Sequence, residues 1–392
     1  MRRTGHIRER SAGSFEIRYN LGTDPATGKR KIATATVRGS RKDAEKELRR
    51  LLRTLDTGEH VDPTRMTVRQ WLITWLGSVR QEVAPGSHHR YSIIVHQHLV
   101  PALGNLPVTK LSPANIQSFY NDLTTTGRRD GRPGPLAPRT RQHIHRVLSA
   151  ALARAVEQQV IARNPADVFK RRLPKVERKE MVALTPEQSA VLLEATRPTP
   201  LYLPVMLALA TGMRRGEILA LRWRNVDLDR GIVRAAESLE QPKGGLRFNP
   251  PKSGRARVIT LPSFAADELR ERKRTQAEQL LKVGIRQSGN TLVCARPDGQ
   301  PTTPLGLSNM FFKFVRKGAV HDLPTLRFHD LRHTHATQLL MAGVHPRIAQ
   351  ERLGHSTVAL TLDLYSHVTA TMQEDAAAKI DAAFKGRSKP VR

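Results

Sequence analysis

A histidine-rich run near the C-terminus, RFHDLRHTHATQLLMAGVHPRIAQERLGHSTVALTLDLYSHV, constrains the fold more than any other part of the chain. His329 and Arg332 lie three residues apart and would share one helix face, so both can point at one anion. Gly354 predicts the end of a short helix directly before His355, and Tyr365 follows ten residues later in an amphipathic segment. Helix, turn and helix can bring these side chains together, and a tyrosine behind cationic groups suggests attack on a phosphodiester.

Each of these residues alone also fits a structural role. A histidine on a helix is more often a surface or core residue, and a tyrosine after leucines usually packs. His329 and His333, at positions i and i+4, could instead ligate a metal. No glutamate follows the first of them, as it would in the zinc protease motif, which makes the metal site the lesser alternative.

A second basic cluster lies upstream, in the string LALATGMRRGEILALRW. The turn predicted at Thr211 and Gly212 places Arg214 at a loop–helix junction, with Glu217 three residues further on. The alternative is a helix that Gly212 caps, followed by ordinary solvated arginines. We expect Arg215 to be such a solvated arginine.

Together these strings resemble the tyrosine recombinase (phage integrase) family, closely over the last half of the chain and loosely over the first. The family pattern is an arginine after Thr-Gly, a hairpin lysine, His-x-x-Arg, Leu-Gly-His and a terminal tyrosine. The lysine would be Lys252 in RFNPPKSGRARVITLP, where a turn-like string precedes a strand-like one. Lys243 is the nearest rival, but the family's lysine precedes a small polar residue and a strand ending in Leu-Pro. The resemblance implies the catalytic positions Arg214, Lys252, His329, Arg332, His355 and Tyr365.

The resemblance implies DNA strand transfer without a metal or any other cofactor. Arg214 and Arg332 would grip the non-bridging oxygens of the scissile phosphate, because planar guanidinium groups match phosphate geometry. They would stabilise the transition state more than the ground state, and His355 would donate to the same oxygens. Tyr365 would attack the phosphorus to give a 3′-phosphotyrosyl link and a free 5′-hydroxyl.

Three further residues would support this attack. His329 is the family's candidate for the base, or for a group that orients the base, because a phenol with a pKa near ~10 needs help at neutral pH. Lys252 would protonate the departing 5′-oxygen. Glu217 would orient Arg214 or His329, since a carboxylate beside the phosphate would repel it.

The composition predicts a polyanionic partner independently of any family. Lys and Arg number 65 against 35 Asp and Glu, which gives a formal charge of +30 and a pI near 11.2. The charge recurs along the chain: residues 1–60 hold 15 Lys and Arg against 8 Asp and Glu, and residues 128–179 hold 14 against 4. We therefore expect extended, salt-sensitive binding to double-stranded DNA.

The sequence also indicates a compartment. No apolar stretch approaches the length of a membrane span, and the N-terminus lacks the apolar core of a signal peptide. Cys294, the chain's one cysteine, can form no internal disulfide and is expected to be a buried strand residue. We expect a cytoplasmic, nucleoid-associated protein with no membrane partner.

The order of predicted elements indicates an α+β protein, mainly helical, with three domains. Residues 1–60 combine two strands, the first of them alternating in hydrophobicity, with a helix that Ser40 would cap, and Asp43 would lie in its first turn. This small sheet with one helix resembles the arm-type DNA-binding domain of larger integrases. A generic packing module is the alternative.

Residues 65–165 are expected to form a helical core-binding DNA clamp domain, and residues 166–180 a basic linker. Residues 181–392 would form a mixed α/β catalytic domain with a C-terminal tail helix. Trp71 and Trp75 lie at helical spacing, which is typical of core residues. A long helix is expected to end at Asn164, before a proline. Thr185 would open the catalytic domain through a capping box.

The leading functional prediction is site-specific recombination by a homotetramer, which integrates and excises a phage or other mobile element. Core sites and arm sites on DNA would be its targets, with directionality or DNA-bending factors as possible partners. The alternatives are a DNA-relaxing or hairpin-forming enzyme with the same chemistry, and a non-catalytic architectural protein. The tail helix could dock on a neighbouring protomer or on its own domain.

Overall fold

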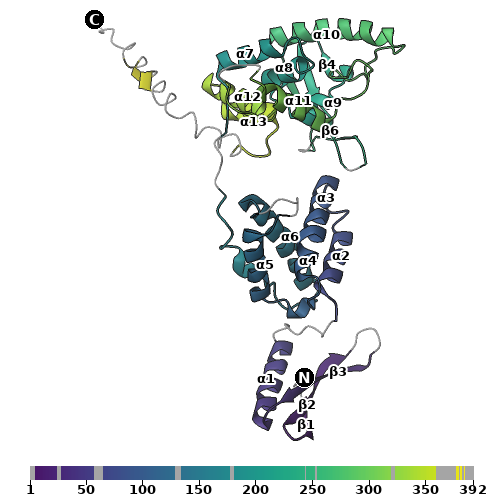
Figure 1. The fold of residues 1–392 in the computed structure, drawn as a ribbon, viewed down its shortest axis with the longest axis vertical. Helices are drawn as coiled ribbons and strands as arrows, with labels where there is room; N and C mark the ends of the chain where they lie inside the picture. The colour runs from purple at the N-terminus through teal and green to yellow at the C-terminus, as the bar shows by residue number, and fades with distance from the viewer. Residues whose placement is uncertain are drawn as a thin grey trace, which may run out of the picture. The chain divides into compact units, whose positions relative to one another are not determined.

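The structure is a computed structural model and describes residues 5–23, 28–56, 65–128, 134–176, 181–242, 244–251, 254–318, 323–358, 377–378, 380–381 and 384. The chain divides into two compact units, residues 1–178 and 179–392 (Figure 1). The expected class, α+β and mainly helical, is confirmed. No helix in these described ranges is long and apolar enough to cross a membrane.

The first unit begins with a three-stranded antiparallel sheet in the order β1-β2-β3. The strands are β1 (Gly5–Ser11), β2 (Ser14–Thr23) and β3 (Arg30–Arg38), and helix α1 (Arg41–Asp56) packs against them. The sequence suggested two of the three strands. Strand β1 was missed because none of its residues is fully buried, so it carries no apolar alternation.

This sheet and helix share a small core of their own. Ile17 and Tyr19 of β2 and Ala44 of α1 are buried in it. Ser40 caps α1 as expected, because its hydroxyl and backbone N–H both bind the Asp43 carboxylate, at 2.7 and 2.9 Å, and the Asp43 N–H donates back to the hydroxyl.

In the described part of the first unit after α1, the regular elements are helical. They are α2 (Val68–Ser78), α3 (Pro85–Ile94), the π-helical turn η1 (Val95–Leu99), α4 (Val100–Leu103), η2 (Val108–Lys110), α5 (Pro113–Thr125), α6 (Pro138–Glu157) and η3 (Asp167–Phe169). Trp71 and Trp75 of α2 are buried, which confirms their expected place in the core. The Trp71 indole donates to the Ala151 carbonyl at 2.9 Å, and Trp75 stacks on Tyr91.

Helix α6 ends earlier than its sequence indicated. Gln159 adopts a φ of 56°, and the Val160 N–H bonds back to the Ala155 carbonyl at 2.8 Å. This left-handed turn ends the helix at Glu157, so the expected end at Asn164 is wrong.

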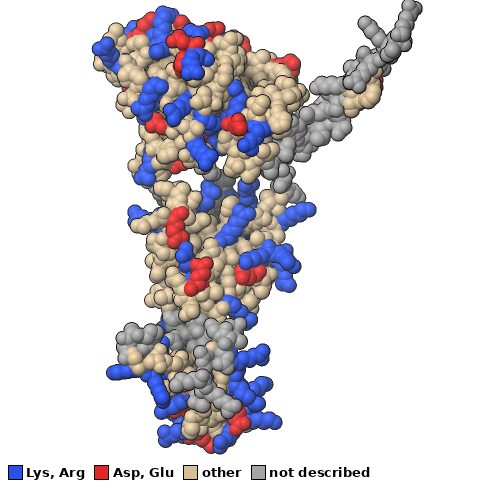
Figure 2. Space-filling view, turned by 180° about the vertical axis from the view of Figure 1, so that it is seen from behind, with Lys and Arg blue, Asp and Glu red and all other residues tan. Residues whose placement is uncertain are grey.

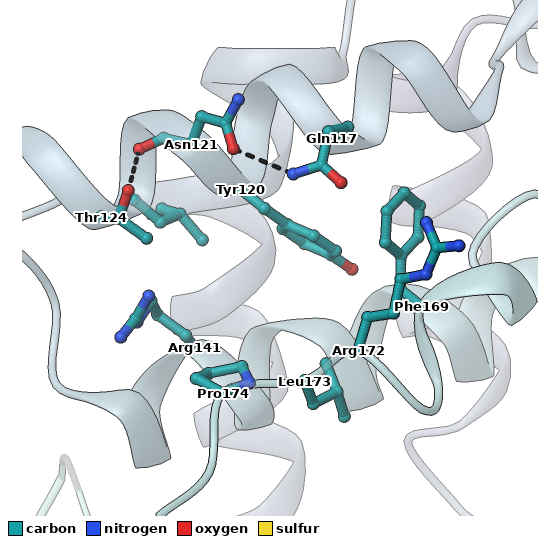
Figure 3. Close-up of a pocket in the computed structure, with 10 residues that line it drawn as sticks. Gln117, Tyr120, Asn121, Thr124, Arg141, Phe169, Arg172, Leu173 and Pro174 are labelled. Carbon is teal, nitrogen blue, oxygen red and sulfur yellow. Dashed lines mark hydrogen bonds between the residues drawn. The ribbon is translucent and has the colours of Figure 1, made fainter.

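A hollow of about 180 Å³ opens beside α5, the start of α6 and the segment that follows η3 (Figure 3). The rings of Tyr120 and Phe169 meet edge to face in it, and Arg141 and Arg172 also line it. The Tyr120 hydroxyl lies 2.7 Å from Nδ1 of His145. Burial raises the pKa of Tyr120 and lowers that of His145, so the pair is neutral and the arginines supply the charge of the hollow.

The second unit is mixed α/β. Its helices are α7 (Pro186–Thr196), α8 (Tyr202–Thr211), α9 (Arg215–Ala220), η4 (Trp223–Asn225), α10 (Ser263–Lys282), α11 (Pro304–Arg316), α12 (Asp330–Met341) and α13 (Pro346–Leu353). Its strands are β4 (Val226–Asp227), β5 (Ile232–Ala235), β6 (Ser238–Glu240), β7 (Arg247–Asn249) and β8 (Arg257–Thr260). They form an antiparallel sheet β4-β5-β8 and a hairpin β6-β7.

The buried helix α8 runs through the core of this unit, with α7, α9 and α12 packed against it (Figure 1). The predicted capping box is confirmed, since the Gln188 N–H donates to the Thr185 hydroxyl at 3.2 Å and the Gln188 amide oxygen accepts from the Thr185 N–H. Cys294 is buried as expected, and burial raises its pKa to about 12. It lies in a turn, however, and the expectation of a strand there is wrong.

The turn that ends α8 predicts a measurable packing effect. Gly212 has a φ of 64°, and a Cβ placed on it would lie 2.6 Å from His335 and 2.7 Å from Leu353. Gly231 has a φ of 61° with nothing within 4 Å, so it is a matched control. We expect Gly231→Ala to lower the free energy of unfolding by about 1 kcal/mol, through backbone strain alone. Gly212→Ala should cost about 1–3 kcal/mol more, because its Cβ also overpacks the core.

Chemical denaturation of the two variants, followed by circular dichroism, measures this difference. Equal losses in unfolding free energy for the two glycines would contradict the tight packing at the end of α8.

Candidate active site

The turn at Thr211 and Gly212 places Arg214 between helices α8 and α9. Helix α8 ends at Gly212, where the left-handed backbone stops it, and the Met213 N–H donates to the Thr211 hydroxyl at 3.2 Å. Arg214 then precedes the first residue of α9, and its backbone N–H donates to a carboxylate oxygen of Glu217 at 2.8 Å. The turn and the start of α9 therefore fix where the Arg214 side chain leaves the backbone.

Arg332 of α12 joins the ends of two helices. The residue is 3% exposed, and its two terminal nitrogens donate to the carbonyls of Gly212 and Leu353, at 2.6 and 2.7 Å. These carbonyls lie at the C-terminal ends of α8 and α13, where helices leave acceptors unpaired and carry partial negative charge. Burial, and then the charges of Arg214 and Arg257, lower the pKa of Arg332 to about 9, so it remains a cation at neutral pH.

The end of α13 binds an arginine at each of three successive carbonyls. We call residues 352–354 the carbonyl turn. Its carbonyls accept, in chain order, from Arg257 at 2.8 Å, Arg332 at 2.7 Å and Arg214 at 2.9 Å. Gly354 closes the turn with a φ of 66°. Two cations predicted from different parts of the sequence, Arg214 and Arg332, thus share one anchor.

Glu217 is the buried counter-charge of this cluster. Its side chain is fully buried. One carboxylate oxygen accepts from the side chains of Arg214 and Arg257, at 2.9 and 3.0 Å. The other oxygen accepts from the Arg257 side chain at 2.8 Å. Burial alone would raise the pKa of Glu217, but these arginines hold it below its ordinary value. The carboxylate therefore orients Arg214, one of the two partners expected for it, and no bond to His329 is present.

His355 follows the carbonyl turn directly. Its N–H donates to the Gln350 carbonyl at 3.1 Å. Burial, then the charges of Arg332 and Arg214, lower its pKa to about 4. The imidazole is therefore neutral at pH 7 and lies close enough to both arginines to feel their charge.

His329 lies at the N-terminal end of α12, with its ring 5.0 Å from that of His333. Burial, then His333 and Arg332, lower its pKa to about 4. His329 is exposed as a residue, so we expect this lowering to be smaller than at the more buried histidines. In the described part of the chain no three His, Cys, Asp or Glu side chains are grouped to hold a metal ion.

A further set of hydrogen bonds involves Arg352 and His335, which the sequence did not suggest. Arg352 donates to Nε2 of His335 at 3.1 Å and to the Ala210 carbonyl at 2.9 Å. His335 then donates through Nδ1 to the Leu209 carbonyl at 2.6 Å, since its other nitrogen accepts. Burial lowers the pKa of His335 to about 4, which keeps this neutral tautomer. These hydrogen bonds connect the end of α8 to α12 and α13.

The structure brings together Arg214, Glu217, Arg332 and His355 and places His329 at the start of the same helix as Arg332. The predicted Lys252 and Tyr365, and the rival Lys243, lie outside the described residues. Arg215 is half-buried and donates to the Ser308 hydroxyl of α11, so the expectation of a solvated arginine is wrong. Arg257 was not predicted, because nothing local to its strand ties it to Glu217.

Known proteins share both the sequence pattern and the fold. The sequence model of the phage integrase family matches residues 180–372, and that of the phage integrase N-terminal SAM-like domain matches residues 67–124. The chain belongs to the phage integrase family. The predicted family and its site-specific recombinase function are thereby confirmed, and the chain is an enzyme of the tyrosine recombinase type. The catalytic residues and the independence from metal stay predictions.

Full-length relatives of the phage integrase family include the ICEBs1 integrase of Bacillus subtilis, 28% identical over 96% of this chain and 99% of the relative. The integrase of Mycobacterium phage D29 is 25% identical over 96% of each chain. Among solved structures, the Tn1549 transposon integrase with circular intermediate DNA has a TM-score of 0.66 at 23% identity, over 81% of this chain and 99% of that one. A lambda integrase dimer on a core site has a TM-score of 0.55 at 18% identity, over 91% and 93%.

The lowered histidine pKa values predict how the site responds to pH. His335 and His355 have a folded pKa of about 4 against an ordinary 6.5, so between these values the unfolded chain binds more protons. The free energy of unfolding should therefore fall as the pH falls through this window. NMR titration, with resonances assigned through His335→Gln and His355→Gln, should show both imidazoles unprotonated down to about pH 5.5. A midpoint near the ordinary value for either ring would contradict the burial argument.

Proposed function

We propose that this enzyme integrates and excises a mobile element by breaking and rejoining DNA through a 3′-phosphotyrosyl bond at Tyr365. The observation that carries the proposal is the pair of cations, Arg214 and Arg332, held by neighbouring carbonyls of one turn. Two guanidinium groups so fixed match the non-bridging oxygens of one phosphate. One relative is the integrase of Mycobacterium phage D29, and the Tn1549 transposon integrase has a similar fold, which supports a mobile element as the target.

The arginines would act mainly on the transition state. The attacked phosphorus gains negative charge on its equatorial oxygens, and preorganised cations in a partly buried site stabilise that charge without reorganising. His355, neutral at pH 7, would donate one N–H to the same oxygens. Because these groups supply the positive charge that divalent ions supply elsewhere, the proposed reaction needs no metal.

Proton transfer would involve His329 and Lys252. A neutral His329 can accept a hydrogen bond or a proton from the Tyr365 phenol as it attacks. Lys252 would give a proton to the departing 5′-oxygen, which leaves a free hydroxyl. The phosphotyrosyl bond stores the energy of the broken phosphodiester, so a second 5′-hydroxyl can reseal the strand.

Double-stranded DNA is the proposed partner of both units. On the face seen in Figure 2, Lys and Arg side chains are spread over the described parts and outnumber acidic ones. The pKa of His143, near the start of α6, is lowered mainly by burial. The charges of three nearby arginines lower it further: Arg146, Arg90 and Arg139. A cluster of this kind suits the phosphate backbone and would make binding weaken steeply with salt.

The division of labour along the chain is part of the proposal. Residues 1–60 would bind arm sites, and residues 65–165 would clamp the core site. Residues 166–180 would link these domains to the catalytic domain at 181–392. Four protomers would assemble on two DNA sites. Directionality or DNA-bending factors could assist. A structure of a lambda integrase tetramer bound to a Holliday junction, with a TM-score of 0.51, supports this assembly.

The first test is covalent capture. Purified protein, incubated in EDTA with a nicked duplex carrying the direct repeat that flanks its own gene, should form an adduct that denaturing gels resolve. Tyr365→Phe should abolish the adduct because the nucleophilic oxygen is gone. Tyr202→Phe, at the first residue of α8, keeps the ring beside Arg197; this variant is the control and should react normally. An adduct that survives Tyr365→Phe, or that requires added Mg²⁺, would refute the assignment.

The second test separates strand exchange from related activities. Two differently labelled plasmids, each carrying one of the flanking repeats, should yield recombinant joints when wild-type protein is added. Topoisomers without joints would indicate a relaxing enzyme of the same chemistry. DNA binding with neither product would indicate an architectural protein.

A further inference from the structure

Arg257 is the third cation of the site, and its guanidinium is committed to protein groups. Its side chain is 10% exposed. Both terminal nitrogens donate to the two carboxylate oxygens of Glu217, at 3.0 and 2.8 Å, and Nε donates to the Arg352 carbonyl at 2.8 Å. One N–H on each of its three nitrogens, including the single Nε–H, is thus used within the fold, whereas Arg332 uses only its two terminal nitrogens and keeps its Nε–H.

The carbonyl turn is shaped to receive this side chain. A Cβ placed on Gly354 would lie 3.0 Å from Cδ of Arg257, so the glycine leaves room for the stem of the arginine. Arg257 is also the first residue of β8, five positions after Lys252 in the sequence. It therefore connects the strand that follows the predicted lysine with α9 and α13.

Arg257 and Arg214 compete for one carboxylate. The fork of Arg257 occupies both oxygens of Glu217, while Arg214 contributes one side-chain bond to Glu217 and one to the Gly354 carbonyl. The Arg214 side chain is 25% exposed, and its remaining N–H groups are not used in these bonds. Without Arg257, Glu217 would be free to take the fork of Arg214 and draw it away from an incoming phosphate.

We propose that Arg257 is a positioning residue for strand cleavage: it holds Glu217 and the carbonyl turn so that Arg214 keeps free N–H groups for the scissile phosphate. The proposal rests on the proposed function. It differs from a phosphate-binding role because Arg257 acts through Glu217 and contacts no DNA. Its removal should therefore slow cleavage while leaving DNA affinity nearly unchanged.

The test compares full-length variants on the nicked duplex bearing the flanking repeat. Arg257→Ala should slow adduct formation about 10- to 100-fold, the range typical of lost supporting contacts, with the dissociation constant for the duplex within about threefold of wild type. Arg257→Lys keeps the charge but cannot form the fork, so cleavage should stay slow. Arg234→Ala removes an exposed arginine from the neighbouring strand β5 and should behave as wild type.

A double variant keeps the test decisive if Arg257→Ala is unstable. Because the two residues act as one unit, Glu217→Gln/Arg257→Ala should cleave no more slowly than Glu217→Gln alone. Additive losses, a full rate in Arg257→Ala or Arg257→Lys, or a loss of affinity as large as the loss of rate would overturn the proposal. If wild-type protein forms no adduct, the proposed function itself fails, and that outcome is separate from a difference between variants.

Discussion

The unpaired carbonyls at the ends of α8 and α13 are the constraint on which the rest of the site depends. A helix leaves its last carbonyls without intrahelical partners, and a buried carbonyl without a partner is costly. Arg332 satisfies one carbonyl from each helix end, at Gly212 and Leu353. The left-handed glycines that stop the helices, Gly212 and Gly354, also aim these carbonyls at the arginines. The residues that end the two helices therefore also position the arginines of the site.

The charge balance of this centre explains why it suits an anion. Three arginines meet at the carbonyl turn, and one buried carboxylate, Glu217, offsets them. The lowered pKa of Arg332 reports the cost of holding these cations together away from water. A phosphate that enters the site would relieve this repulsion. The same imbalance would favour the transition state further, because that state carries more negative charge than the bound diester.

Local features were predictable from the sequence because their causes are local. The glycine stops at Gly212 and Gly354, the capping box at Thr185 and the buried Trp71 and Trp75 each depend on a few neighbouring residues. The grouping of Arg214 with Glu217 follows from a three-residue spacing at the start of a helix.

Long-range contacts escaped prediction for the opposite reason. Arg257 reaches Glu217 forty positions away, and Arg352 reaches the Ala210 carbonyl, so neither spacing nor periodicity signals them. The end of α6 was misplaced because Gln159 adopts a left-handed conformation that its residue type does not favour. Tertiary packing decided each of these cases.

A structure of the Tyr365→Phe protein bound to its nicked core duplex tests the central claim most directly. The distances to measure run from the scissile phosphate oxygens to the guanidinium nitrogens of Arg214 and Arg332. The account predicts hydrogen bonds from both arginines to one phosphate while Arg332 keeps its bonds to the Gly212 and Leu353 carbonyls. A phosphate bound elsewhere, or an Arg332 that leaves the two helix ends to reach it, would contradict the account.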